Sequence, residues 1–599
     1  MRFPYERFRR GQKESIIRIS KYLGNFIVLK APTGFGKTIV AILSHSSADN
    51  VLYVVRTINE IAPVIRELRR AGIDFTFVYS GRRMCPLLKG SEVDPNDFWI
   101  NCKVVRNRRL CSFYERLSSV SITDITEVLK GSSIDPREIV NDLISKLSVC
   151  PFFALTRLIP KSHFTIATYP YLFKEDVYRT AFSNGLDEFY VIIDEAHTIL
   201  NPQSIYEEEL SDVDVNQALR EARAYSLGSE VVNFLRDLIN VVSKIRSRML
   251  KRLEKAFIYP GEGFLQILED AIIDIRLKRL KEFLESPETI VRISTKLTKV
   301  LKFLSTIKDQ NFEAYGISDV YGKRIKALPV SYEPIRSRLE VAKGVLMMSG
   351  TMPPKLVIDK ILGKESQYID VESDYGEVFP HHHTYYAVYA ETTSSYHRRS
   401  TYMYSKYAEL ITKVYDSLTR GIVLTVHPSY QFMNEVVSRI DVKINQVVED
   451  PYTSLSEVLS KSLSYDKVII HAVASGKVTE GIEIIDPRSN KSLINVVIIA
   501  GVPYPQPDDY VKDLRRNLVK EFGRELADKL VMDIPAVIKV LQAIGRAVRS
   551  ERDRAFIVLA DRRFLSRELK ALLNIRYDLV TTNLAILARH IELFTKGFL

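Results

Sequence analysis

The segment that most constrains the fold lies near the start of the chain, where a glycine-rich loop joins an apolar run to an apolar helical pattern. Residues 25–30 (NFIVLK) predict a buried strand, and IVAIL, from residue 39 onward, predicts the start of a helix. Between them lie residues 31–38 (APTGFGKT), whose glycines allow backbone N–H groups to wrap a chain of phosphates. The pattern predicts a P-loop inside a parallel α/β domain. The residues expected to hold the phosphates and Mg²⁺ are Gly34, Gly36, Lys37 and Thr38.

Two long regions of the chain alternate short apolar runs with helical patterns, as parallel α/β domains do. In the first region the apolar runs are residues 25–30, 51–55, 164–168, 189–193 and 344–348. In the second region they are residues 421–426, 467–472, 495–501 and 555–560. Such runs are typical of strands that helices cover on both faces. Because 599 residues are too many for one hydrophobic core, we predict two RecA-like α/β domains with parallel sheets.

The first region is interrupted twice. Residues 80–155 contain every cysteine of the chain, and residues 204–332 have mainly helical periodicity. Within the second interruption, residues 240–257 predict an amphipathic helix with Ile245, Met249 and Leu253 on one side. We interpret the basic side of this helix as solvated, in preference to a contact with nucleic acid or a partner. The basic side consists of Lys244, Arg248, Lys251, Arg252 and Lys255. The predicted boundaries are residues 1–79, 156–203 and 333–385 for the first domain, 80–155 and 204–332 for the insertions, and 386–599 for the second domain.

Two carboxylates follow the predicted strand at residues 189–193, in the sequence Asp194-Glu195-Ala196-His197. They are expected at the carboxyl edge of the sheet, beside the P-loop. Hydrolysis of a nucleoside triphosphate needs one carboxylate on the metal side and one that orients and deprotonates the attacking water. We assign the first role to Asp194 and the second to Glu195, and expect His197 to relay the nucleotide state to neighbouring loops.

The second region supplies Gln542, Arg546 and Arg549, at i, i+4 and i+7. On a helix these side chains would share one face. An arginine on that face would neutralise charge developing on the γ-phosphate from across the cleft between the domains. The alternative is an ordinary surface face of salt bridges.

The four cysteines, Cys85, Cys102, Cys111 and Cys150, are separated by 16, 8 and 38 residues. The N-terminus lacks the apolar core of a signal peptide, and no run approaches the ~18 apolar residues that cross a bilayer. We therefore expect a soluble cytoplasmic protein without a membrane partner, where thiols bind inorganic groups rather than form disulfides. The spacings lack the short C-x₂₋₄-C gap of structural zinc sites. A Cys₄ inorganic site is preferred to zinc or to unligated core cysteines.

Taken together, these motifs resemble the XPD family of iron–sulfur superfamily 2 DNA helicases, over nearly the whole chain. Residues 3–5 with Gln12 resemble the adenine-reading Q motif, and Arg56 and Thr57 lie in a match to motif Ia. Residues 349–352 (SGTM), 476–483 (GKVTEGIE) and 542–549 (QAIGRAVR) resemble motifs III, V and VI. The intervals of 157 residues from Lys37 to Asp194 and 152 from His197 to Ser349 leave room for the family's two insertions. The chain departs from the family pattern at Gly81, Pro170, Thr479 and Glu483.

The resemblance implies that the four cysteines bind a [4Fe–4S] cluster and that the second insertion is an Arch-like helical domain. It also implies DNA contacts through Arg56, Thr57 and Lys477. Tyr169 and Tyr171 follow a strand where the family approaches DNA, so they are candidates for stacking on bases; packing in the core is an equal alternative. Four basic residues between the second and third cysteines could contact the DNA backbone, offset cluster charge or be solvated: Lys103, Arg106, Arg108 and Arg109. Because the family's domain helps form the pore where the duplex is split, the resemblance favours the backbone contact.

The function implied by the resemblance is that of an ATP- and Mg²⁺-dependent DNA helicase. It would move 5′ to 3′ on single-stranded and forked DNA in a repair pathway similar to nucleotide excision repair. We expect a prokaryotic, nucleoid-associated monomer whose Arch-like insertion contacts repair proteins. The alternatives are a DinG-like iron–sulfur helicase, an RNA helicase of the DEAH type, and a nucleotide-gated DNA-binding scaffold that does not unwind. The net charge of +12 is compatible with a polyanionic partner but does not choose among them.

Overall fold

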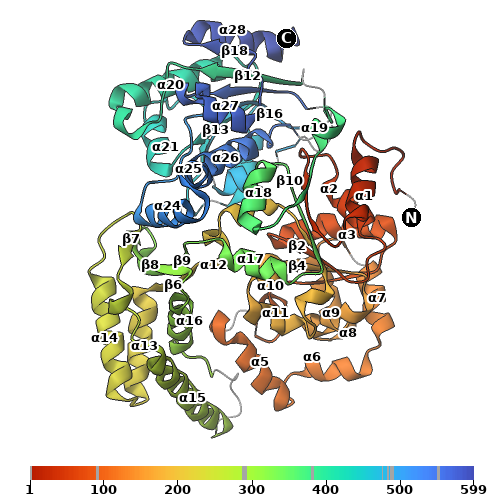
Figure 1. Ribbon diagram of the computed structural model, residues 1–599, viewed down its shortest axis with the longest axis vertical. Coiled ribbons are helices and arrows are strands. Elements are labelled where there is room, and N and C mark those ends of the chain that lie inside the picture. The colour runs from red at the N-terminus through yellow and green to blue at the C-terminus, as the bar shows by residue number, and fades with distance from the viewer. Residues whose placement is uncertain are drawn as a thin grey trace.

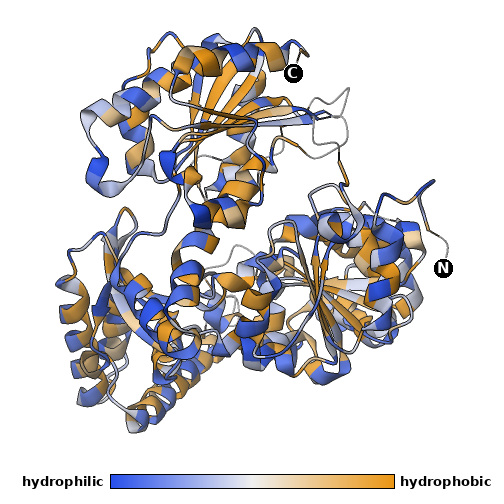
Figure 2. Ribbon diagram, turned by 45° about the horizontal axis from the view of Figure 1, so that its top comes forward, coloured by the Kyte–Doolittle hydropathy of each residue, from blue (hydrophilic) through white to orange (hydrophobic). Residues whose placement is uncertain are grey.

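The described residues form three sheets (Figure 1). The computed structural model describes residues 3–88, 93–131, 133–285, 293–379, 383–452, 454–474, 476–481, 484–485, 491–548 and 553–598. Two sheets have seven parallel strands each, and the third has four antiparallel strands. The two parallel sheets, with the helices that cover them, are called domain 1 and domain 2. Their strands are the apolar centres of the two α/β units in Figure 2, so the prediction of two parallel-sheet domains is confirmed.

The sheet of domain 1 has the strand order β11-β1-β10-β5-β2-β4-β3. Its strands are β1 (Phe26–Lys30), β2 (Val51–Val55), β3 (Phe75–Val78), β4 (Phe164–Thr168), β5 (Tyr190–Ile193), β10 (Gly344–Ser349) and β11 (Gln367–Asp370). The main covering helices are α1 (Gln12–Lys21), α2 (Lys37–Ser44), α3 (Ile61–Ala71), α10 (Tyr169–Phe173), α11 (Glu175–Ala181), α17 (Glu333–Glu340) and α18 (Lys355–Leu362). All five predicted strands are present, because each is an apolar run buried on both faces. Strands β3 and β11 were not predicted.

The sheet of domain 2 has the order β14-β15-β13-β16-β17-β12-β18. Its strands are β12 (Thr384–Tyr389), β13 (Gly421–His427), β14 (Gln446–Val448), β15 (Lys467–Val473), β16 (Ile494–Ile499), β17 (Ala555–Leu559) and β18 (Leu579–Thr581). Its helices include α20 (Thr401–Asp416), α21 (Tyr430–Val437), α22 (Leu455–Leu463), α23 (Lys477–Gly481), α26 (Ile534–Ile544), α27 (Arg567–Leu573) and α28 (Leu584–Thr595). The four predicted strands are present and central. The three that were missed lie towards the edges and are only partly buried.

The cysteine insertion, residues 80–155, folds into a small helical lobe below domain 1 in Figure 1. It contains α4 (Gly81–Met84), α5 (Phe98–Asn107), α6 (Ser112–Glu115), α7 (Ile122–Gly131), α8 (Pro136–Leu147) and α9 (Pro151–Thr156). No single helix of the described chain is long and apolar enough to cross a membrane. The helices Pro136–Leu147 and Pro151–Lys161 meet that test only together, as a pair bent by 102°.

The second insertion, residues 204–332, combines four longer helices with the antiparallel sheet, which was not predicted. Its helices are α13 (Asp212–Ala224), α14 (Ser229–Ser243), α15 (Glu262–Glu285) and α16 (Leu297–Lys308). Its sheet has the order β6-β9-β8-β7, with β6 (Glu208–Ser211), β7 (Lys251–Leu253), β8 (Phe312–Asp319) and β9 (Gly322–Pro329). The sheet forms the part of the insertion nearest to domain 2, and the helices extend away from it (Figure 1).

The helix predicted over residues 240–257 is wrong. Helix α14 ends at Ser243, and Lys251–Leu253 pairs with β8 as an edge strand. Ile245 is buried against Gly316 of β8, where an added Cβ would lie 2.9 Å from Ile245 Cδ1, so the chain leaves the helix to pack Ile245 on the sheet. The basic residues accordingly share no helical face, and Arg252 is 3.0 Å from Glu313 and 3.5 Å from Asp513.

Helix α24 (Asp509–Phe522) ties domain 2 to the rest of the molecule. It lies between the domain 2 sheet and β7 in Figure 1. Asn517 donates a hydrogen bond to the Val330 carbonyl oxygen (3.3 Å), and Arg336 of α17 pairs with Glu521 at 2.6 Å. The apolar face of α24 belongs to the same hydrophobic core as domain 1.

The two insertions are joined to each other by a buried carboxylate. Asp97, before α5, is fully buried and pairs with Arg276 of α15. It also accepts hydrogen bonds from the Thr298 hydroxyl (2.9 Å) and from the backbone N–H of Thr295 (2.8 Å). Nearby, Asn101 accepts from the Ile293 N–H at 2.9 Å. One carboxylate therefore satisfies donors from two segments of the second insertion.

Replacing Asp97 with alanine should loosen this junction. The change leaves the Arg276 charge and the Thr295 N–H without their buried acceptor, which costs about 3 kcal/mol. Hydrogen exchange should become about a hundredfold faster in α5 and α16 and stay unchanged in the two parallel sheets. Lys130→Ala is the control, because its pair with Asp74 is largely exposed. Unchanged protection in α5 and α16 would show that Asp97 does not hold the junction.

Candidate functional site

The P-loop has the backbone that its glycines predict. Gly34 and Gly36 both have positive φ, 83° and 90°, and α2 begins at the next residue, Lys37. An added Cβ on Gly36 would also lie only 2.7 Å from Gln12 Nε2, so glycine is required there by conformation and by space. Lys37 Nζ donates to the carbonyl oxygens of Ala31 (3.2 Å) and Pro32 (3.3 Å) within the same loop. Its amine therefore lies over the loop, where a phosphate chain would be bound.

Gln12 lies directly against the P-loop. Its side chain is buried, donates to the Phe35 carbonyl oxygen at 2.6 Å and accepts from the Arg9 N–H at 2.8 Å. The structure thus places Gln12 next to Gly36. A residue that reads the base of a nucleotide bound by this loop would need such a position.

Asp194 and Glu195 lie at the carboxyl end of β5, beside the P-loop. Asp194 accepts a hydrogen bond from the Tyr53 hydroxyl (3.1 Å), and Glu195 has a left-handed backbone with φ 48°. Burial and the neighbouring charge of Glu195 raise the pKa of Asp194, although the Lys37 ammonium opposes the shift. A divalent cation would reverse it, because the ion favours the ionised carboxylate. The Asp194 carboxylate and the Thr38 hydroxyl are the hard oxygen ligands that Mg²⁺ prefers, so the residues present fit that ion.

A chain of hydrogen bonds runs from Glu195 into domain 2. Gln542 Nε2 of α26 is 2.6 Å from His197 Nε2, which must accept because an amide nitrogen only donates. His197 Nδ1–H then donates to Ser349 Oγ (2.8 Å), and Ser349 donates to Glu195 Oε2 (3.2 Å). Burial is the largest single influence on the pKa of Glu195 and raises it, but the contacts with His197, the Lys37 ammonium and the Ser349 hydroxyl together outweigh burial and lower this pKa. A chain of four residues therefore runs from the proposed base, Glu195, to Gln542 in the opposite domain.

The helix predicted to carry Gln542, Arg546 and Arg549 is shorter than expected. Helix α26 ends at Ile544, and residues 545–547 form a turn, so Arg546 lies beyond the helix that carries Gln542. Arg549 lies outside the described residues. The turn nevertheless reaches the nucleotide site, because an added Cβ on Gly545 would lie 3.6 Å from Thr33 Oγ1 in the P-loop.

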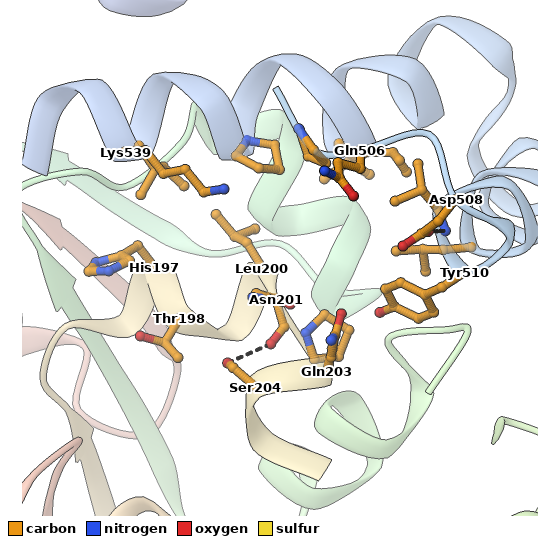
Figure 3. A pocket seen from close by; sticks show the side chains of 18 of the residues that line it. His197, Thr198, Leu200, Asn201, Gln203, Ser204, Gln506, Asp508, Tyr510 and Lys539 are labelled. Atoms are coloured by element: carbon orange, nitrogen blue, oxygen red, sulfur yellow. Dashed lines mark hydrogen bonds between the residues drawn. The ribbon is translucent and has the colours of Figure 1, made fainter. Parts of the chain in front are cut away.

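A cavity of about 310 Å³ lies between the domains, next to the His197–Gln542 contact (Figure 3). Arg56 and the segment from His197 to Ser204 line it from domain 1, and Gln506, Tyr510 and Lys539 from domain 2. Arg56, predicted to contact DNA, therefore lies at the junction of the domains. The neighbouring Thr57 is exposed, and its hydroxyl and N–H both bond to Glu60.

The other candidate DNA contacts differ in exposure. Tyr169 and Tyr171 are buried, and their hydroxyls donate to the carbonyl oxygens of Asp194 (2.6 Å) and Tyr79 (2.8 Å). Neither ring presents a face to a base, so the packing alternative accounts for both, and Tyr169 supports the loop that carries the two carboxylates. Lys477, by contrast, is exposed at the start of α23, and its Nζ donates to the Pro451 carbonyl oxygen at 2.8 Å.

The four cysteines lie in the helical lobe, close enough to one another for their charges to interact. Three are buried, Cys102 is half-buried, and none of the four, all of which are described, is in a disulfide. Burial raises the pKa of Cys102 to about 11 and of Cys150 to about 12. Cys85 and Cys111 add to the shift of Cys102, and the other three thiols add to the shift of Cys150. The described residues hold no group of three or more His, Cys, Asp or Glu side chains placed to bind a metal ion.

Four cysteine thiols are the donor set that iron–sulfur clusters take. The Arg106 guanidinium favours the charged form of Cys102 and so opposes the rise that burial causes in the pKa of this thiol. The same guanidinium lies over the rings of Tyr114 (4.8 Å) and Phe153 (4.5 Å). Compensation of cluster charge stays a prediction for Arg106, which lies beside Cys102. A [4Fe–4S] group bound by four thiolates therefore fits the donor set.

Two family models match the chain: a model named DEAD_2 over residues 53–217 and a helicase C-terminal domain over residues 412–575. The ATP-dependent DNA helicase XPD of Sulfolobus acidocaldarius is 31% identical over 90% of this chain and 93% of its own length. The chain belongs to the XPD helicase family. A solved structure titled XPD_Helicase superposes with a TM-score of 0.75 at 27% identity, covering 96% of this chain and 100% of that one.

More distant relatives share less of their length with this member of the XPD family. The ATP-dependent DNA helicase CHL1 of Candida glabrata is 21% identical over 79% of this chain, which spans 63% of that protein. The regulator of telomere elongation helicase 1 homolog of Drosophila yakuba is 23% identical over 86% of this chain and 61% of its own length.

Sequence reasoning missed Tyr53 as a functional residue. It lies in β2 beside β5, is fully buried and bonds to Asp194. Within VLYVV it cannot be distinguished from a core tyrosine, because only strand pairing places it opposite the carboxylate. In this XPD family member, the hydroxyl of Tyr53 bonds to the Asp194 carboxylate and also interacts with the Thr38 side chain of the P-loop.

Proposed function

We propose that the chain is an ATP-dependent DNA helicase that moves 5′ to 3′ along single-stranded DNA and separates the duplex ahead of it. The observation that carries the proposal is the hydrogen-bond chain from Glu195 through Ser349 and His197 to Gln542. It joins the carboxylate that would act on water to the opposite domain. Family membership supports the same activity, since the Sulfolobus relative is named an ATP-dependent DNA helicase.

In this proposal the P-loop binds ATP, with Lys37 on the β- and γ-phosphates and Thr38 and Asp194 on Mg²⁺. Glu195 orients and deprotonates the attacking water. Gln542, with Arg546 and Arg549, completes the site from domain 2, and an arginine stabilises charge on the γ-phosphate. Because domain 2 supplies these groups, binding of ATP closes the cleft and hydrolysis relaxes it.

The DNA would be held by Arg56, Thr57 and Lys477 across the two domains. We also propose that the helical lobe carries a [4Fe–4S] cluster on Cys85, Cys102, Cys111 and Cys150, which would hold the segments of the lobe in place. Contact between the two insertions at Asp97 supports their acting together on the separated strands. We assign the protein to DNA repair of the nucleotide excision type, as a nucleoid-associated monomer whose Arch-like insertion contacts repair proteins.

Hydrolysis of ATP stimulated by single-stranded DNA tests this function. We expect turnover to rise on addition of oligodeoxynucleotides and the half-saturating DNA concentration to increase steeply with salt, because phosphate contacts dominate binding. Oligoribonucleotides of the same sequence should stimulate less. Equal or greater stimulation by RNA would contradict the proposal in favour of a DEAH-type RNA helicase.

A further inference from the structure

Two exposed tyrosines from distant parts of the chain meet at the surface between the second insertion and domain 2. Tyr321 lies in the turn of the β8–β9 hairpin and is 56% exposed; Tyr452 follows β14 and is 73% exposed. Their ring centroids are 6.3 Å apart, with an angle of 63° between the rings. Val320, beside Tyr321, is also 73% exposed. Large apolar side chains thus gather at one exposed place without being buried by the contact.

The place they occupy is the carboxyl edge of the domain 2 sheet. Strands β14, β15 and β13 are neighbours, and the residues that follow them include Tyr452, Lys477 and Tyr430, respectively. Lys477 Nζ bonds to the Pro451 carbonyl oxygen, next to Tyr452. Burial raises the pKa of Tyr430 to about 12, and the charges of Glu449 and Tyr321 add to the shift, so Tyr430 lies near the tip of the hairpin.

The contact is not needed to hold the insertion on domain 2. That attachment is made at β7 and β8, where Asp513 of α24 accepts from the Tyr315 hydroxyl (3.1 Å) and lies 3.5 Å from Arg252. The Leu250 carbonyl oxygen also accepts from the Asp509 N–H at 3.1 Å. A buried network therefore positions the hairpin, and its exposed tip is available for another purpose.

Carboxylates slightly outnumber cations around the tyrosines: Asp319, Asp450 and Glu449 lie there with Arg324 and Lys477. Asp319 pairs with Arg324, whose guanidinium lies 5.2 Å from the centre of the Tyr321 ring, and Asp450 accepts from the Tyr452 N–H at 2.7 Å. Glu449 accepts from the backbone N–H groups of Val473 and Val478. A ligand attracted by charge alone gains little here, whereas a flat aromatic ligand gains a stacking surface. The faces of single-stranded bases have this chemistry. The Lys477 ammonium, bonded to the Pro451 carbonyl oxygen next to Tyr452, is a cation for the phosphate backbone.

We propose that Tyr321 and Tyr452 form a base-stacking platform for single-stranded DNA, made jointly by the second insertion and domain 2. The proposal rests on the function proposed above and adds a site to it. The platform binds base faces and is independent of base identity, because every base has a π-face. Because the two tyrosines come from different parts of the molecule, the affinity for the DNA strand would depend on the position of the second insertion relative to domain 2.

The test compares oligodeoxynucleotides that differ by one abasic nucleotide, moved along the bound length, with fluorescence anisotropy as the readout. For the wild-type chain, affinity should fall at least about fivefold when the missing base is the stacked one. The Tyr321→Ala and Tyr452→Ala variants should bind the intact oligonucleotide more weakly than the wild type by a similar factor. Their affinity should not fall further when the base at that position is missing. Tyr321→Phe and Tyr452→Phe keep the ring and should bind as the wild type.

Tyr402→Ala is the matched control, because Tyr402 is 64% exposed on α20 of the same domain and stands apart from the hairpin. The loss in the two alanine variants should also be equal at low and high salt, since stacking releases no counterions. If both alanine variants respond to every abasic position as the wild type does, the tyrosines only join the domains and the platform is refuted. A wild-type chain that binds no single-stranded DNA would instead overturn the proposed function itself.

Discussion

Replacing Lys37 with alanine should abolish ATP hydrolysis in the presence of DNA, lowering the turnover number by at least about a hundredfold. The Lys37 amine lies over the P-loop carbonyl oxygens, and in the ATP complex it is the cation that meets the β- and γ-phosphates. Loss of a positioned charge that stabilises the transition state costs about 3 kcal/mol or more. A phosphate-release assay with saturating single-stranded DNA measures the effect.

The control for this variant is Lys30→Ala, at the end of the strand that leads into the P-loop. Lys30 pairs with Asp370 at 2.9 Å, and both side chains are partly exposed. Its loss should leave turnover within about twofold of the wild type, because such pairs contribute about 1 kcal/mol or less to stability. A Lys37→Ala chain that still hydrolyses ATP would show that residues 31–38 are not the catalytic phosphate site.

Replacing Cys102 with serine should remove the visible brown absorbance and the bound iron, and with them strand separation. Cys102 is the half-buried member of the four thiols, and serine supplies no thiolate to a cluster. Most of the DNA-stimulated ATPase should survive, because the P-loop and the carboxylates belong to the domain 1 sheet and not to the lobe. Iron analysis, absorbance and ATPase on the same preparation measure the three effects together.

Ser119→Ala controls for substitution within the lobe. The Ser119 hydroxyl is exposed and bonds only to the Arg116 carbonyl oxygen, so the cluster and strand separation should be retained. A wild-type protein that is colourless and contains one zinc ion would contradict the cluster assignment. Loss of ATPase in Cys102→Ser equal to that in Lys37→Ala would contradict the separation of the lobe from the nucleotide site.

The strands that carry the nucleotide site could be predicted because their residues are almost all apolar, which is typical of buried strands. Runs such as VLYVV are apolar at every position, and helices cover both faces of the sheet there. The shorter strands β14 and β18 were missed because each is a partly exposed edge strand of three residues. The hairpin of the second insertion did carry a signal, since Gly322 with φ 95° ends its turn, but the helical periodicity on either side obscured it.

The sequence predicted which residues belong to the candidate site better than it predicted how they are arranged in space. The P-loop and Asp194-Glu195 lie where their strands place them, because local sequence sets both. The end of α26 at Ile544 could not be read from the motif, since spacing alone is compatible with a continuing helix. Contacts such as Gln542 with His197, or Tyr321 with Tyr452, join residues more than a hundred positions apart, so only the packed domains reveal them.

Strand separation on tailed duplexes tests the central claim most directly. A duplex with a 5′ single-stranded tail, one with a 3′ tail and a blunt duplex are each incubated with the protein, Mg²⁺ and ATP, and the released strand is measured. We predict that the 5′-tailed duplex is separated, that the other two are not, and that Lys37→Ala separates none. A wild-type protein that binds the tail and hydrolyses ATP but releases no strand from any of the three would contradict the helicase account and identify a nucleotide-gated scaffold.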